Sequence, residues 1–194
     1  MTRISYKSNK YAIALIITLL IVLVIGKVPQ RIYDAAQLDN YPQKYKRYVS
    51  ACSQEFGVPE KIIYATIKTE SNFRPRARSS AGAVGLMQLM PDTFEWLTEQ
   101  MLRENLPLYR RTDPYTNIRY GTYMLSWLYD YYGDWETVFA AYNAGPGRVN
   151  SWLKDSRYSS NGKLTYIPNS ETRAYVQRQL SNIEKYENLY YTGE

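Results

Sequence analysis

The residue best placed for acid–base chemistry in this 194-residue sequence is Glu70. Ile63, Ile67 and Glu70 are spaced by four and three residues, so on a helix they share one side. A carboxyl group beside apolar neighbours near a helix C-terminus is hard to ionise, because burial and the helix dipole both disfavour its charge. The expected raised pKa leaves an acid able to protonate a leaving oxygen near neutral pH. The alternative is an ordinary glutamate in a last helical turn, solvated or paired with an arginine that follows it.

The composition leaves carboxylates and tyrosines as the main chemical groups. The sequence has no His, which excludes Ser-His and Cys-His nucleophile pairs, histidine bases and the usual zinc sites. Its one Cys, Cys52, cannot form an intrachain disulfide or a cysteine metal cluster. The 21 Tyr residues suit clefts in which a ring packs while its hydroxyl stays hydrated. We therefore expect neither a metal site nor a cofactor.

Two glycine-containing loops offer polar groups that could meet the acid. Residues 79–88 are mostly small and end in Gln88, whose amide could give a sugar one donor and one acceptor, or could simply point to water. Residues 140–145 place Tyr142 and Asn143 at a helix end beside a Gly-Pro-Gly turn. A packed tyrosine with a helix-ending asparagine explains that segment as well as a binding role does.

The elements that must position these groups are predicted to be helices, so the expected fold class is mainly α. Gly57 and Gly133 are the expected ends of two helices, and Asp134 is the expected N-cap of another. The predicted helices cover residues 42–56, 59–71, 91–102, 113–132, 135–144 and 170–190. Strand-like extension is expected only over residues 163–167.

Apolar stripes give two of these helices an expected inward face. In the helix over 113–132 the stripe contains Met124, Leu125 and Leu128. In the last helix it contains Val176, Leu180 and Ile183.

The N-terminal region is predicted to anchor the chain in a membrane. Residues 11–28 are long enough as a helix to cover about 27 Å, which just crosses a bilayer. A cleaved signal peptide is the alternative, but residues 26–31 lack a small-x-small cleavage pattern. The positive-inside tendency favours a cytoplasmic tail over residues 1–10 and places the rest outside, although a cytosolic domain remains possible on topology alone. Residues 29–41 are then a juxtamembrane linker and 42–194 a single globular domain.

The charge distribution argues against nucleic acid as a partner. The formal net charge is +6, but four basic residues and no acid precede residue 28, so the remainder carries 20 basic and 18 acidic residues, about +2. A weak positive bias is compatible with an anionic polymer substrate.

Four segments, taken together, resemble the lytic transglycosylase family with a soluble-type (SLT), goose-lysozyme-like catalytic domain. Glu70-Ser71-Asn72-Phe73 is similar to its catalytic Glu-Ser motif, and residues 85–88 to its Gly-Leu-Met-Gln motif. Residues 141–145 are similar to its Ala-Tyr-Asn-Ala-Gly motif, and 167–168 with 171–176 to its closing Ile-Pro and Glu-Thr-Arg-x-Tyr-Val motif. The four occur in the family's order.

The resemblance implies a lysozyme-like, α-rich fold and a bacterial peptidoglycan substrate. It implies cleavage of the β-1,4 bond from N-acetylmuramic acid (MurNAc) to N-acetylglucosamine (GlcNAc) without water, leaving a 1,6-anhydro ring on the muramyl sugar. Glu70 is then the only acid/base, and the muramyl N-acetyl group takes the place of the second carboxyl that most glycosidases use. Glu171 is the one other acid in the motifs, and it could instead pair with an arginine or cap the last helix.

The resemblance also implies supporting roles by motif position. Ser71 would hold the substrate or the acid, and Met87 and Gln88 would line the saccharide cleft. Tyr142 and Asn143 would position Glu70 or the N-acetyl group, and Tyr175 would hydrogen-bond Glu70. The run Arg74, Arg76, Arg78 could meet carboxylates of the peptide stems or form a solvated loop face.

These features predict a single-pass bacterial membrane protein whose catalytic domain lies on the extracytoplasmic side and acts on glycan strands. A muramidase would use the same acid but deliver water to C1. A membrane-tethered wall-binding module without turnover, or an anchored structural protein with a Tyr-rich binding surface, are alternatives from other classes. The sequence leaves the oligomeric state open.

Overall fold

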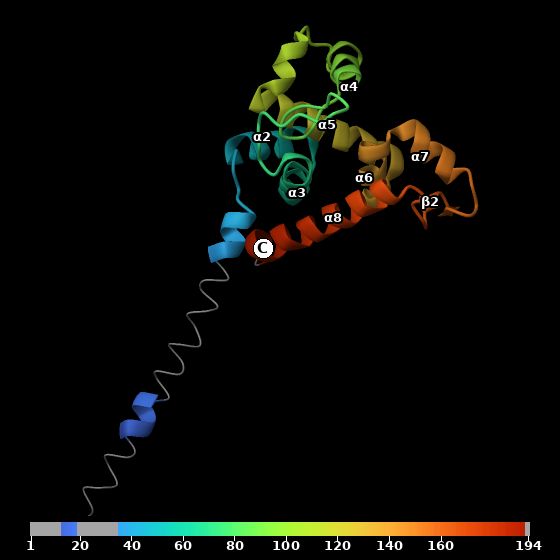
Figure 1. Cartoon of the computed structure of the whole chain (residues 1–194). Helices are drawn as coiled ribbons and strands as arrows, with labels where there is room; N and C mark the ends of the chain where they lie inside the picture. Colours follow the sequence, from blue (N-terminus) through green and yellow to red (C-terminus); the bar gives the residue numbers. More distant parts are fainter. Residues whose placement is uncertain (1–12, 19–34, 193–194) are drawn as a thin grey trace, which may run out of the picture. The chain divides into compact units, whose positions relative to one another are not determined.

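The computed structural model describes residues 13–18 and 35–192, and the chain divides into two units, residues 1–42 and 43–194 (Figure 1). In the first unit residues 13–18 and 35–40 are helical. Most of the predicted membrane segment, residues 11–28, lies outside the described residues. Within the described ranges, none of the helices has both the length and the apolar character needed to span a bilayer.

The second unit is mainly helical, as predicted. Its α-helices are α2 (Lys46–Phe56), α3 (Glu60–Ser71), α4 (Pro91–Trp96), α5 (Pro114–Tyr132), α6 (Trp135–Ala144), α7 (Pro146–Leu153) and α8 (Ser170–Tyr186). A π-helical turn, Leu97–Met101, continues α4, and another, Glu187–Tyr191, continues α8. A 3-10 turn covers Leu108–Thr112, and β1 (Ser159–Ser160) pairs antiparallel with β2 (Lys163–Leu164).

Side-chain caps and left-handed residues set the helix ends. Asp113, Asp134 and Asn169 each accept a hydrogen bond from the backbone N–H three residues later, at 2.8 to 3.0 Å. Gly57 and Gly133 end α2 and α5 with φ of 69° and 65°, which L-residues with a Cβ rarely adopt. The predicted cap at Asp134 and the two glycine stops are confirmed.

Among the differences from the prediction are two shifted boundaries and one helix, α7, that was not predicted. Helix α2 begins at Lys46 rather than Pro42, because Tyr45 is left-handed with φ of 63° and interrupts the helical backbone. Pro146 follows the end of α6 but also starts α7, because a proline fits the first helical position, where its missing N–H is not needed. Strand pairing covers only residues 163–164 of the predicted 163–167.

Helix α8 packs against α3 and α6, and it carries the closing motif across both (Figure 1). Its inward face is formed by Thr172, Tyr175, Val176 and Gln179, all at most 3% exposed. The predicted stripe was therefore wrong at Leu180, which is 37% exposed. The inward face is instead polar at three of four positions, because their hydrogen-bonding groups meet partners on α3 and α6. The stripe on α5 is confirmed, since Met124, Leu125 and Leu128 are buried.

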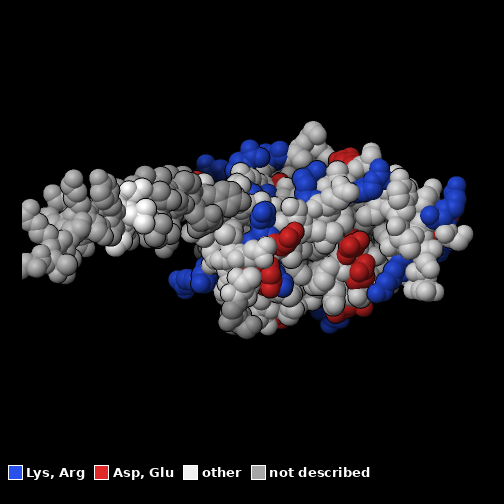
Figure 2. All heavy atoms as spheres, turned by 90° about the horizontal axis from the view of Figure 1, so that it is seen from below, with Lys and Arg blue, Asp and Glu red and all other residues white. Residues whose placement is uncertain are grey.

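Charged side chains on the surface carry both signs. Figure 2 shows basic and acidic residues interspersed over the face seen from below, without a continuous field of either sign. This agrees with the nearly balanced charge that the sequence assigns to the chain after residue 28.

Candidate active site

Glu70 lies in the last turn of α3, next to the residues that end the helix. Asn72 closes α3 with φ of 49°, and Phe73 follows with φ of 61°, so the chain turns sharply away just after the acid. Ile63 and Ile67 are fully buried on the side that Glu70 shares, as predicted. Glu70 itself is partly exposed and borders a hollow of about 720 Å³. The other residues lining this hollow are Phe73, Arg74, Pro75, Arg76, Ala77, Arg78, Ser79 and Gln88.

The surroundings of Glu70 favour its protonated form. Burial raises the pKa of Glu70 from an ordinary 4.5 to about 7, although the hydrogen bond from Tyr175 and the charge of Arg178 act in the opposite direction. A carboxyl with this pKa is part acid and part base near neutral pH, so it can give a proton and take one back. The cation that acts on it comes from α8 and not from the arginine run that follows Glu70 in sequence.

Tyr175 reaches Glu70 from α8. Its hydroxyl donates to Glu70 Oε1 at 2.6 Å, and the ring is only 3% exposed. Burial and the nearby Glu70 carboxyl raise the pKa of the Tyr175 phenol well above its usual range, so the phenol keeps its proton throughout the working pH range. Tyr175 is therefore a permanent donor to one oxygen of the acid, and the other oxygen remains available for proton transfer.

Gln179 lies one helical turn beyond Tyr175 and fixes the direction of this hydrogen bond. Gln179 is fully buried, and its amide nitrogen donates to the Tyr175 oxygen at 2.9 Å and to Thr66 Oγ1 at 3.4 Å. Because the Tyr175 oxygen accepts a hydrogen bond from this amide, the tyrosine's own proton is directed to Glu70. A chain of hydrogen bonds thus runs from Gln179 through Tyr175 to Glu70.

Ser71 and Met87 hold the segment 84–88 against the end of α3. Ser71 is 2% exposed, and its hydroxyl is 2.8 Å from the Leu86 carbonyl oxygen and 3.1 Å from that of Ile67. The Met87 side chain is fully buried against Gly121, where a Cβ would lie 2.6 Å from the Met87 sulfur. Both residues therefore touch the protein's own interior in this structure.

Gln88 borders the hollow from the end of the same segment. It has φ of 50°, and its amide nitrogen donates to the carbonyl oxygens of Gly85 at 2.9 Å and Ala77 at 3.2 Å. The amide nitrogen is thus used to join two parts of the loop, while the side chain still faces the hollow that contains Glu70.

Tyr142 and Asn143 connect α6 to the two other parts of the site. The Tyr142 hydroxyl donates to the Met87 carbonyl oxygen at 2.8 Å. Burial, together with the charge of the Glu70 carboxyl, raises the pKa of Tyr142 well above its usual range. Asn143 is exposed, and its Oδ1 accepts a hydrogen bond from Thr172 Oγ1 of α8 at 2.8 Å.

The sequence reasoning missed two buried amides that support this arrangement. Gln179 could have been found from its i, i+4 spacing to Tyr175, which puts both on one side of a helix. Asn117 donates to the Val84 carbonyl oxygen at 3.0 Å and accepts from the Met87 N–H at 2.7 Å. Asn117 could have been found because it is a polar residue in register with the apolar stripe of α5, seven residues before Met124. Gly85 makes room for it, because a Cβ there would lie 2.2 Å from Asn117 Nδ2.

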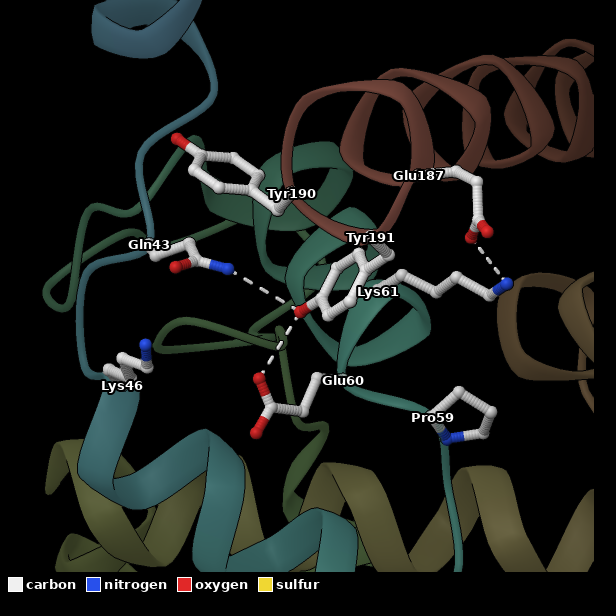
Figure 3. Close-up of a pocket in the computed structure, with 8 residues that line it drawn as sticks. All are labelled: Gln43, Lys46, Pro59, Glu60, Lys61, Glu187, Tyr190 and Tyr191. Atoms are coloured by element: carbon white, nitrogen blue, oxygen red, sulfur yellow. Dashed lines mark hydrogen bonds and ion pairs between the residues drawn. The ribbon is translucent and has the colours of Figure 1, made fainter. Parts of the chain in front are cut away.

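A second hollow of about 660 Å³ lies at the opposite end of α3, and Figure 3 shows its lining. Glu60 accepts hydrogen bonds there from Ser50 Oγ at 2.5 Å and from the Tyr191 hydroxyl at 3.2 Å. Tyr191 also accepts from the Gln43 amide at 3.5 Å, and Lys61 forms an ion pair with Glu187. These contacts connect the C-terminal π-helical turn to α2 and α3, so we interpret the residues around this hollow as structural.

The chain is similar in sequence to known lytic transglycosylases. Residues 47–164 match the family described as the transglycosylase SLT domain. The soluble lytic murein transglycosylase of Escherichia coli K12 is 38% identical over 149 residues, which cover 73% of this chain and 22% of that protein. The membrane-bound lytic murein transglycosylase C of Sodalis glossinidius is 30% identical over 176 residues, 76% of this chain and 48% of that protein.

Solved structures show the same likeness in three dimensions. The 70 kDa soluble lytic transglycosylase of E. coli superimposes with a TM-score of 0.71 at 31% identity, over 81% of this chain and 26% of that one. An inactive mutant of the lytic transglycosylase Slt from Pseudomonas aeruginosa gives 0.68 at 35% identity, over 78% and 25%. The chain therefore spans about a quarter of the length of these relatives. The likeness confirms the mainly helical, lysozyme-like fold class.

The region that matches the family, residues 47–164, contains α3 with Glu70, the loop 84–88 and α6. The chain belongs to the transglycosylase SLT domain family.

Proposed function

We propose that the protein is a lytic murein transglycosylase that cleaves the MurNAc-β-1,4-GlcNAc bond of peptidoglycan without water. The observation that carries this proposal is the half-protonated Glu70, held by Tyr175 at the edge of a hollow. The relatives that are named lytic murein transglycosylases support the same choice of substrate and reaction class.

In the first step Glu70 protonates the glycosidic oxygen. The bond between that oxygen and muramyl C1 breaks, and the GlcNAc side leaves as an alcohol. The muramyl N-acetyl group stabilises the positive charge that develops at C1. A carboxylic acid with a pKa near 7 suits this step, because it is strong enough to donate and is still protonated near neutral pH.

In the second step the Glu70 carboxylate takes the proton of the muramyl C6 hydroxyl while that oxygen bonds to C1. The product carries a 1,6-anhydro ring, Glu70 regains its proton, and no water is consumed. One carboxyl suffices for both steps, which agrees with the lining of the hollow, where Glu70 is the only acid among the described residues. Glu171 is exposed in the first turn of α8, where Asn169 provides the N-cap.

The remaining motif residues divide into two proposed roles. Gln88, Tyr142 and Asn143 bind or position the sugar and its N-acetyl group near the acid. Ser71 and Met87 support substrate binding by holding the loop that ends in Gln88, since their own side chains are buried. Tyr175 orients Glu70.

We further propose the domain order that the sequence predicts. Residues 1–10 form a cytoplasmic tail, 11–28 a membrane-crossing helix, 29–41 a linker and 42–194 the catalytic domain on the extracytoplasmic side. The apolar run between basic ends supports this order. Fusion of a reporter to each end, followed by protease treatment of intact cells, tests it. A C-terminal reporter that is protected inside the cell would contradict the proposed orientation.

The reaction is tested by incubating the full chain, kept in detergent, with purified peptidoglycan and determining the masses of the released muropeptides. Anhydro-ended fragments are expected. Reducing ends would instead identify a muramidase, and no release from an active preparation would identify a wall-binding protein. A Glu70→Gln variant, folded by circular dichroism, is the matched negative control.

A further inference from the structure

Three arginines share the hollow with Glu70. Arg74, Arg76 and Arg78 lie in the segment after α3, and all three line the same 720 Å³ space as the acid. Arg74 donates through Nε to the Ser71 carbonyl oxygen at 3.0 Å. Within residues 13–18 and 35–192, none of the three forms an ion pair with a carboxylate. Their guanidinium groups are exposed to the hollow or to solvent rather than neutralised by the fold.

A fourth arginine, Arg111, does not line the hollow but donates to the Gly82 carbonyl oxygen at 3.4 Å, in the same loop region. The pKa of Arg111 is lowered first by burial and then by the charge of Arg78, while Glu95 acts in the opposite direction. Arg111 is therefore near enough to Arg78 for like-charge repulsion, which a bound anion would relieve. Glu70 balances this charge only in part, because its pKa of about 7 leaves it half protonated near neutral pH.

We propose that Arg76 and Arg78, with Arg74, bind carboxylates of the peptide stems that the glycan strand carries, and so favour strands whose stems are charged. This inference rests on the proposed function, because it takes peptidoglycan as the occupant of the hollow. A guanidinium presents two parallel N–H donors that match the two oxygens of a carboxylate. The aromatic side chain in the lining, Phe73, is only 5% exposed. The arginines are therefore joined in the polar lining by Glu70, Ser79 and Gln88, and they supply its positive charges.

The test compares two preparations of the same peptidoglycan, one with free stem carboxylates and one in which they are converted to amides with a carbodiimide and ammonia. Both are first treated with hydrofluoric acid, because phosphate polymers attached to the wall would offer the same charge. The full-length wild-type protein should cleave the carboxylate form with a kcat/KM about fivefold higher, mostly through KM, and lose this preference in high salt.

The double variant Arg76→Gln/Arg78→Gln should lose that preference. It should cleave both preparations at one rate, equal to the rate at which the wild type cleaves the amidated form. Arg47→Gln, an exposed arginine on α2 outside this hollow, should keep the preference. Equal cleavage of both preparations by the wild type, or a double variant that retains the preference, would overturn the proposal.

A binding measurement distinguishes failure of this inference from failure of the proposed function. Glu70→Gln protein, with and without the two arginine changes, is sedimented with each preparation. If the wild type releases no fragments, the proposed reaction fails, yet weaker sedimentation of the arginine variant with the carboxylate form alone would still support carboxylate recognition. Sedimentation that is unchanged by both the arginine substitutions and the amidation would refute carboxylate recognition.

Discussion

Helix α3 has a glutamate at each end, and the two are held in opposite ways. Glu60 lies in the first turn, where the helix dipole favours a negative charge, and it accepts hydrogen bonds from Ser50 and Tyr191. Glu70 lies ten residues later, about 15 Å along the helix, in the last turn, where the dipole disfavours its charge. It receives one neutral hydrogen bond and is desolvated enough to bring its pKa to about 7.

The difference shows that residue type and partial burial do not by themselves determine how a carboxyl group is held. Both side chains are partly exposed and both border a hollow of similar volume. Glu60 accepts two hydrogen bonds at the N-terminal end of the helix, whereas Glu70 accepts one at the C-terminal end and burial raises its pKa.

Replacing the two glutamates separately gives the largest expected contrast. Glu70→Gln should lower the rate of peptidoglycan cleavage at least about a thousandfold, because no other acid lines its hollow among the described residues. Glu60→Gln should leave kcat nearly unchanged and lower the free energy of unfolding by about 1 kcal/mol, through loss of charge at a helix N-terminus. Muropeptide release and thermal unfolding measure the two effects. A Glu70→Gln enzyme that still cleaves peptidoglycan would contradict the role proposed for Glu70.

Removing the one donor to Glu70 should raise its pKa further. The Tyr175 hydrogen bond lowers the pKa, so Tyr175→Phe should shift the alkaline limb of the kcat/KM profile to higher pH. The rate at the optimum should fall about ten- to a hundredfold, because the acid is less well oriented. A pH–rate profile from pH 5 to 9 measures both. An alkaline limb that moved to lower pH would contradict the assigned direction of this hydrogen bond.

The raised pKa of Glu70 should also appear in the stability of the protein. The folded state binds the proton more tightly than the unfolded state, whose pKa is near 4.5, so the stabilisation is full below about pH 4.5 and is lost as pH rises through about 7. Relative to Glu70→Gln, the wild type should lose about 3 kcal/mol between pH 4.5 and 8. Denaturant unfolding at several pH values measures this, and parallel curves for the two proteins would refute it.

The smallest expected effect concerns the residue behind Tyr175. Gln179→Leu removes the donor to the Tyr175 oxygen. The Tyr175 hydroxyl can then rotate away from Glu70, so we expect kcat to fall about tenfold. Gln177→Leu is the matched control, because Gln177 is on the same helix but exposed. The Gln179→Met variant, which also lacks the donor, should resemble Gln179→Leu. If Gln179→Leu unfolds at the same temperature and turns over at the wild-type rate, Gln179 has no positioning role.

Much of the local structure follows from the sequence, because its determinants are local. The caps at Asp113 and Asp134 and the glycine stops at Gly57 and Gly133 depend on residues within one helical turn. The placement of Glu70 beside Ile63 and Ile67 follows from the same short-range periodicity. The motifs around Glu70, Gln88 and Asn143 made the family recognisable before any packing was known.

Other features were decided only when distant segments met. The inward face of α8 is formed by Thr172, Tyr175 and Gln179 instead of Leu180, because α3 and α6 supply partners for polar groups that hydropathy alone would assign to solvent. The pKa of Glu70 likewise depends on burial created by elements more than a hundred residues away. Periodicity could place an acid on a helix face, but only tertiary packing could remove its water and choose its single donor, since both depend on contacts that no short stretch of sequence contains.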